Sequence, residues 1–163
     1  MADLLNPRLI GLAGYAGSGK DTAAGCLVQL GWERRAFAGA LKDLATRIGW
    51  DGRKDDAGRR LLQELGVGAR DILGADVWVN ALMATLEGPS VICDVRFPNE
   101  VAAIADHGGI TLRIVRPGVG PALGHVSETA LDDLELPVVV NDGDVFDLHA
   151  RVLAILAACP ATP

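Results

Sequence analysis

Gly14-Tyr-Ala-Gly-Ser-Gly-Lys-Asp-Thr22 is a glycine-rich loop that follows the apolar run 9–13 and precedes a helical pattern. Closely spaced glycines let successive backbone N–H groups turn toward one point, and the next helix adds the positive end of its dipole. Lys20 adds a mobile positive charge. A flexible turn is the alternative interpretation. Because strand, loop, lysine and helix occur together, the sequence predicts a nucleotide-phosphate site.

The loop departs from the usual pattern directly after its lysine. Gly-x-x-x-x-Gly-Lys is normally followed by Ser or Thr, whereas here Asp21 follows and Thr22 comes one residue later. A carboxylate in this place is a candidate for the shell of a metal ion. Its alternative role is to stabilise the positive end of the helix dipole. The residues predicted to bind the phosphates are Gly14, Ala16, Gly17, Ser18, Gly19, Lys20, Asp21 and Thr22.

The composition favours one domain, 1–163. Half of the 163 residues are hydrophobic, and no linker rich in Gly, Ser or Pro divides them. We expect no membrane partner, because there is no apolar run of membrane-spanning length and no signal peptide. Cys26, Cys93 and Cys159 lack metal-binding spacing. Free thiols in a reducing compartment are therefore expected, which predicts a cytoplasmic protein.

The charge pattern argues against a nucleic-acid polymer as partner. The net charge is −6 and no run of basic residues occurs. Only three of the fifteen basic residues are lysines. Compositional bias favours arginine here, and planar guanidinium groups also bind phosphates through two hydrogen bonds, so both reasons contribute. The apolar content allows a homodimer without requiring one.

Apolar runs alternate with helical patterns, which predicts an α/β fold. We expect strands at 9–13, 32–37, 89–94, 110–115 and 137–141. Helices are expected at about 23–30, 41–48, 61–65, 77–86, 99–107 and 145–156, with a polar stretch at 51–60. The stretch 116–125 is too rich in proline and glycine to be regular.

The strand 89–94 ends in a carboxylate, Asp94. Such a strand can hold Mg²⁺ beside a phosphate-binding loop, although many buried strands end in Asp as a cap. Asp21 and Asp94 are therefore the candidate metal residues. Pro98 suits the start of a helix and leaves Arg96 on a loop above the carboxyl ends of the strands. Arg96 can bind a phosphate there, form an ion pair with Glu100, or do both.

Several short motifs follow one another along about 9–148. They are Gly14-x-x-Gly17-x-Gly19-Lys20-Asp21-Thr22, Phe37-Ala-Gly-Ala-Leu41-Lys42-Asp43, Leu61-Leu62-Gln63-x-Leu65-Gly66 with Arg70, Asp76-Val-Trp78-Val, Asp94-Val-Arg96-Phe97-Pro98-Asn99-Glu100, Ser127-Glu128-Thr129 and Asn141-Asp-Gly143. In this combination the chain resembles the deoxynucleoside monophosphate kinases of tailed bacteriophages. Its loop also resembles that of phosphomevalonate kinase, which shares the lysine followed by aspartate.

The resemblance implies a P-loop NTPase fold of the NMP-kinase type, with a five-stranded parallel sheet flanked by helices. It also implies an NMP-binding helical insertion at about 38–86 and a lid at about 116–134. The donor would be ATP with Mg²⁺, the acceptor a dNMP, and the products ADP and dNDP. For a phage-encoded chain the location would be the host cytoplasm.

The resemblance also implies roles for individual residues. Lys20, Asp94, Arg96 and Arg116 would be catalytic, and Asn141 and Gly143 would line the adenine. The residues implied to bind the acceptor are Lys42, Arg60, Gln63, Arg70, Trp78, Arg96, Ser127 and Glu128. Some have plain alternatives: Lys42 as a solvated helix lysine, Trp78 as a core residue and Ser127 as a helix cap.

Two other functions are carried as alternatives. One is a kinase for another small phosphorylated acceptor, similar to phosphomevalonate. The other is a nucleotide-sensing module that binds ATP and a partner protein without catalysis. The chain contains Lys20, Asp94 and Arg96 together, and this set of candidate catalytic residues argues against the sensing module.

Overall fold

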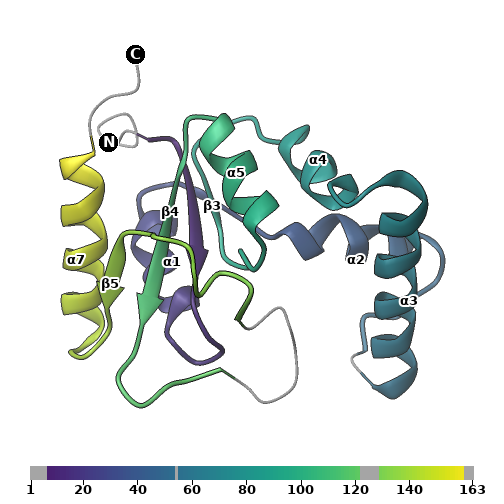
Figure 1. Ribbon diagram of the computed structural model, residues 1–163, viewed down its shortest axis with the longest axis horizontal. Coiled ribbons are helices and arrows are strands. Elements are labelled where there is room, and N and C mark those ends of the chain that lie inside the picture. The colour runs from purple at the N-terminus through teal and green to yellow at the C-terminus, as the bar shows by residue number, and fades with distance from the viewer. Residues whose placement is uncertain (1–6, 54, 122–128, 160–163) are drawn as a thin grey trace. The chain divides into compact units, whose positions relative to one another are not determined.

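The computed structural model describes residues 7–53, 55–121 and 129–159 (Figure 1). The chain divides into two compact units. The sheet unit comprises Met1–Arg35 together with Glu87–Pro163, and the helical unit comprises Ala36–Leu86.

The sheet unit contains five parallel strands in the order β2-β3-β1-β4-β5. The strands are β1 (Leu9–Ala13), β2 (Glu33–Arg35), β3 (Ser90–Ile92), β4 (Ile110–Val115) and β5 (Val138–Val140). The central strand β1 is buried along its whole length, as expected where helices cover both faces of a parallel sheet. This arrangement confirms the predicted α/β fold with a five-stranded parallel sheet.

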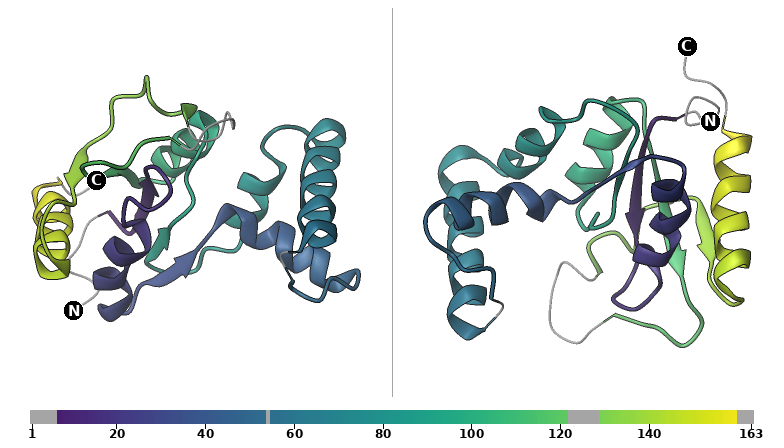
Figure 2. Two further views of the ribbon diagram at one scale, coloured as in Figure 1. Left: turned by 90° about the horizontal axis from the view of Figure 1, so that it is seen from below. Right: turned by 180° about the vertical axis from the view of Figure 1, so that it is seen from behind.

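Helices cover both faces of this sheet (Figure 2). They are α1 (Lys20–Gln29), α5 (Pro98–Asp106) and α7 (Val145–Ala158). Ile10 and Leu12 point into a core that also contains Leu27 of α1 and Leu148 of α7. Gly11, between them, faces the opposite way, because side chains alternate along a strand. A Cβ on Gly11 would lie 2.5 Å from Ile104 Cδ1, so α5 packs directly on β1.

The helical unit contains α2 (Phe37–Arg47), α3 (Asp56–Leu73) and α4 (Val77–Met83). A Cβ on Gly66 of α3 would lie 3.2 Å from Leu41 Cδ2 of α2, so the missing side chain lets the two helices approach closely. The Trp78 indole Nε1–H donates to the Gly66 carbonyl oxygen at 3.2 Å and fixes α4 against α3.

Two expectations for the helical unit need correction. Helix α3 begins at Asp56, inside the stretch 51–60 that its polarity placed before the helix. The reason is local: Asp55 Oδ1 accepts a 2.8 Å hydrogen bond from the Gly58 N–H and caps the first turn. Lys42 was expected at the start of its helix, but α2 begins at Phe37 and Lys42 lies in its middle.

The predicted strand bounds agree with the structure for two of the five strands. Strands β1 and β4 have the predicted bounds, whereas β2, β3 and β5 are shorter than predicted. Strand β3 ends at Ile92, so Asp94 lies on the loop that follows. Within the described ranges, every helix is too short or too polar to cross a lipid bilayer.

Candidate phosphate-binding site

The loop 14–19 connects β1 to α1 and has a backbone that only glycine adopts easily. Gly14, Gly17 and Gly19 have φ values of 135°, 81° and 101°. A Cβ on Gly14 would lie 2.3 Å from the Ile114 carbonyl oxygen of β4. The loop therefore lies close against the carboxyl end of the sheet, where parallel α/β folds place their ligands.

Two features of this phosphate-binding loop fit a phosphate group. A Cβ on Gly17 would meet no atom within 4 Å, so the loop faces open space at this residue. Ser18 is 1% exposed, and its Oγ has no hydrogen-bond partner within the described part of the chain. A buried hydroxyl without a partner is rare in a folded protein and points to a missing ligand.

The Lys20 side chain lies over the same loop. Its Nζ donates to the carbonyl oxygens of Gly14 at 2.6 Å and Tyr15 at 2.9 Å. An ammonium group has three N–H donors and no acceptor, so it can exchange these carbonyls for phosphate oxygens when a ligand binds. Lys20 is therefore placed to carry positive charge to a bound phosphate.

Asn141, predicted to line the adenine, contacts the phosphate-binding loop. It follows β5, and its Nδ2 donates to the Ser18 carbonyl oxygen at 2.9 Å. Gly143 has a different neighbour. A Cβ there would lie 2.3 Å from Asp147 Oδ2, and the same oxygen accepts a hydrogen bond from the Asp144 N–H at the start of α7.

The two candidate metal residues share one neighbourhood. Asp21 Oδ1 accepts a hydrogen bond from Arg34 Nη2 of β2 at 2.5 Å, and both side chains are exposed. Burial raises the pKa of the Cys93 thiol, the nearby Arg34 guanidinium opposes that increase, and the charges of Asp21 and Asp94 add to it. Arg34 thus pairs directly with Asp21, and Asp94 follows Cys93 in the sequence. Sequence reasoning missed Arg34, and no local motif marks it.

A magnesium ion fits this neighbourhood only with help from a ligand. Within 7–53, 55–121 and 129–159, no group of three or more His, Cys, Asp or Glu residues could hold a metal ion. Mg²⁺ bound to a nucleotide usually needs only one or two protein carboxylates, because phosphate oxygens and water complete its coordination. Asp94 and Asp21 therefore remain the candidate carboxylates for such an ion.

The loop that carries Arg96 is fixed by Glu100. This residue is 6% exposed, and its Oε2 accepts hydrogen bonds from the backbone N–H groups of Arg96 at 2.6 Å and Phe97 at 3.0 Å. Pro98 begins α5 as predicted. Glu100 thus fixes the loop through backbone groups, and the Arg96 side chain is exposed at the carboxyl end of the sheet.

Arg116 begins the stretch that was predicted as a lid. Its carbonyl oxygen accepts a 3.1 Å hydrogen bond from the Val119 N–H, and Gly118 has a φ of 80°. Pro followed by a glycine of positive φ is typical of a type II turn. The Arg116 side chain is exposed. Ser127 and Glu128 lie outside the described residues.

The sequence did not predict the contact between the segment 131–134 and the phosphate-binding loop. The Arg113 guanidinium of β4 donates to the carbonyl oxygens of Leu131, Asp132 and Leu134. Tyr15 Oη donates to Asp132 Oδ2 at 2.9 Å. Arg113 therefore anchors a segment that contacts the loop.

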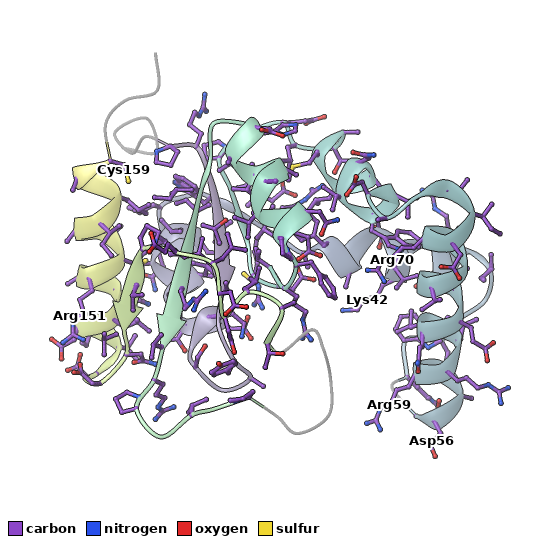
Figure 3. All side chains as sticks on the ribbon, viewed as in Figure 1. Lys42, Asp56, Arg59, Arg70, Arg151 and Cys159 are labelled. Carbon is purple, nitrogen blue, oxygen red and sulfur yellow. The ribbon has the colours of Figure 1, made fainter. Side chains whose placement is uncertain are left out.

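The candidate acceptor residues lie on the helical unit. Arg60 Nε is 3.6 Å from Glu64 Oε1, and Gln63 is exposed on the same helix. Lys42 follows Leu41, and Arg70 lies one turn after the Gly66 that Leu41 contacts. Figure 3 agrees in showing Lys42 and Arg70 near the junction of α2 and α3, with Arg59 farther along α3. Trp78 is 7% exposed, which fits its core alternative.

No family model matches this chain. The "Uncharacterized protein ORF77" of Ictalurid herpesvirus 1 is 32% identical over 160 residues, which cover 90% of this chain and 69% of that protein. The "Putative deoxynucleotide monophosphate kinase" of Acanthamoeba polyphaga mimivirus is 29% identical over 184 residues. The alignment covers 90% of this chain and 94% of the viral protein. The resemblance found in the motifs is confirmed by this viral relative, and the finding supports a kinase, that is, a phosphotransferase.

Two solved structures align with nearly the whole chain at low identity. TT1252 from Thermus thermophilus aligns over 94% of this chain and 98% of its own, with 19% identity and a TM-score of 0.48. A sugar kinase from Janibacter sp. HTCC2649 aligns over 96% of this chain and 99% of its own, with 19% identity and a TM-score of 0.46.

Proposed function

This chain belongs to the same protein family as ORF77 of Ictalurid herpesvirus 1, and we propose that it is a deoxynucleoside monophosphate kinase. It transfers the γ-phosphate of ATP to a dNMP and releases ADP and a dNDP. The observation that carries the proposal is the phosphate-binding loop, with its left-handed glycines, its unsatisfied Ser18 hydroxyl and Lys20. The mimivirus relative, by its name, favours a deoxynucleotide monophosphate as the acceptor.

The donor phosphates bind the loop through backbone N–H groups at the start of α1. Lys20 leaves the carbonyl oxygens of Gly14 and Tyr15 and moves to the β- and γ-phosphates. Asp94 and Asp21 would hold Mg²⁺, and the ion would neutralise phosphate charge when bound. Arg34 fixes the position of the Asp21 carboxylate for this task.

The acceptor binds the helical unit, which we propose as the NMP-binding region. Lys42 and Arg70 are two cations near the junction of α2 and α3 and suit a monophosphate (Figure 3). Gln63 has both a donor and an acceptor for the edge of a base. Arg60 completes this group, and Trp78 is left out because it is buried in the core.

Catalysis in this proposal is electrostatic. The transferring phosphoryl group passes through a loose transition state that needs charge stabilisation and positioning more than proton transfer. Lys20, Arg96 and Arg116 supply positive charge, and Arg96 also contacts the acceptor phosphate. The stretch 116–134 acts as a lid that excludes water, which would otherwise accept the phosphoryl group.

A coupled ADP-release assay tests the proposal. The purified chain is given ATP and Mg²⁺ with each of the four dNMPs, the ribonucleotides and phosphomevalonate in turn. We expect release above the acceptor-free rate with one or more dNMPs. Release with phosphomevalonate alone would favour the alternative kinase. No release with any nucleotide, from a chain that still binds ATP, would contradict the proposal.

A further inference from the structure

We propose that Asn141 is a positioning residue that holds the phosphate-binding loop in its ligand-binding conformation, instead of reading the base of the nucleotide. The inference rests on the proposed donor site in the loop but not on the identity of the acceptor. Its starting observation is the hydrogen bond of 2.9 Å from Asn141 Nδ2 to the Ser18 carbonyl oxygen.

This contact sets the direction of one peptide group. In a planar trans peptide the C=O and the following N–H point in opposite directions. Because Asn141 holds the Ser18 carbonyl oxygen, the Gly19 N–H points away from Asn141. Gly19 has a φ of 101°, and a glycine tolerates either orientation of the preceding peptide, so the backbone alone does not fix this direction. The Asn141 amide therefore selects it.

Asn141 also fills the space beside Gly19. A Cβ on Gly19 would lie 2.4 Å from Asn141 Nδ2. The amide thus lies directly against the loop backbone, and no side chain separates the two. Contact and hydrogen bond together limit rotation of the Ser18–Gly19 peptide toward Asn141.

The backbone around Asn141 is itself held firmly. The Asn141 N–H donates to the Val115 carbonyl oxygen of β4 at 2.7 Å. On α7, Arg151 Nη1 donates to the Val140 carbonyl oxygen and to Asp142 Oδ1, each at 2.5 Å. Arg151 of α7 is therefore hydrogen-bonded to the residues on both sides of Asn141, and the Asn141 backbone is hydrogen-bonded to the sheet. A positioning residue needs such support.

The same helix is also tied to the start of α1. His149 Nε2 lies 2.7 Å from the Thr22 carbonyl oxygen. Helix α7 therefore supports this region in two ways. Arg151 holds the residues beside Asn141, which contacts Ser18, and His149 contacts Thr22 directly. Asn141 and His149 thus contact backbone carbonyl oxygens on either side of Lys20 in the sequence.

Inorganic tripolyphosphate separates a positioning role from base recognition, because it has the phosphates of ATP but no base or sugar. The test measures the Kd of tripolyphosphate, ATP and GTP by calorimetry, with Mg²⁺, for the full chain and for the Asn141→Asp and Asn141→Ala variants. The carboxylate of the Asp variant keeps the shape of the amide but cannot donate to the Ser18 carbonyl oxygen. We expect both variants to weaken all three ligands by the same factor, about tenfold.

Matched controls come from Asn80, an exposed asparagine on α4. Asn80→Asp and Asn80→Ala introduce the same chemical changes in the helical unit and should leave all three Kd values unchanged. The melting temperature of each variant is measured as well. If the Asp variant does not fold, the Ala variant carries the test. If neither folds, Asn141→Gln, which keeps an amide donor, should restore both folding and tripolyphosphate binding.

Other results would overturn the inference. If the variants weaken ATP and GTP but not tripolyphosphate, Asn141 contacts the base or sugar. If they lower the melting temperature while binding is unchanged, the role of Asn141 is stability alone. A wild-type chain that binds none of the three ligands would overturn both the inference and the donor site. Intact binding without transfer to any dNMP would contradict only the proposed kinase activity.

Discussion

The phosphate-binding loop and the helical unit present their functional groups in different ways. In the loop the proposed binding groups are mainly backbone N–H donors, and residues outside the loop contact it: Asn141 donates to Ser18, and Asp132 accepts from Tyr15. In the helical unit the candidate groups are exposed side chains such as Gln63 and Arg60 on the surface of α3. Backbone groups recognise any polyphosphate, whereas side chains can be exchanged without altering the fold.

This difference separates two kinds of expected effect. Changes at the loop and the adjoining carboxylates should reduce the rate of phosphoryl transfer with every acceptor. Changes in the helical unit should alter the affinity for the acceptor and leave ATP binding unchanged.

The largest effect is expected for Lys20→Met. The variant keeps an unbranched side chain but loses the charge, so stabilisation of the transferring phosphoryl group is lost. We expect kcat to fall by about 100- to 1000-fold with every dNMP, measured by ADP release. The melting temperature of the variant is measured beside wild type, so that a loss of turnover can be separated from a loss of the hydrogen bonds to the carbonyl oxygens of Gly14 and Tyr15. Full turnover by this variant would remove the assigned role of the loop.

Asp94→Asn should follow, with kcat lower by about 100-fold and a higher Mg²⁺ requirement. Asp21→Asn should cost less, about tenfold, because the exposed Asp21 carboxylate is already engaged by Arg34 and is less available to a metal ion. Both values come from ADP release over a Mg²⁺ titration. Asp106→Asn, at the exposed end of α5, is the matched control. An Asp21 variant more impaired than the Asp94 variant would reverse the proposed order of the two carboxylates.

The smallest effect on kcat is expected in the helical unit. Arg70→Ala removes one of the two cations near the junction of α2 and α3, so the KM for the dNMP should rise about tenfold while the Kd of ATP stays unchanged. Arg59→Ala, on the same helix but farther from Lys42, is the matched control (Figure 3). Equal changes in both variants would show that the general charge of the unit, and not this pair, attracts the acceptor.

The sequence predicted what depends on neighbouring residues. The bounds of β1 and β4 and the position of the loop follow from local apolar runs and closely spaced glycines. The start of α3 was missed because residues 51–60 lack an apolar period, although Asp55 supplies a cap that marks the true start. A capping residue was therefore a better signal than polarity.

The contacts that support the loop could not be predicted, because they join distant residues. Asn141 and Ser18 are 123 positions apart, and Tyr15 and Asp132 are 117 apart. Such pairs follow from the strand order, which brings the ends of β4 and β5 to the loop after β1. The role of Arg34 was not predicted for the same reason, since its partner Asp21 lies on a different element.

The most direct test follows the transferred group itself. ATP labelled in its γ-phosphate is incubated with the chain, Mg²⁺ and each dNMP, and the products are separated by chromatography. The proposed function predicts label in one or more dNDPs, formed in equal amount to ADP and absent with Lys20→Met. Label found only in inorganic phosphate, or remaining in ATP with every dNMP, would contradict it.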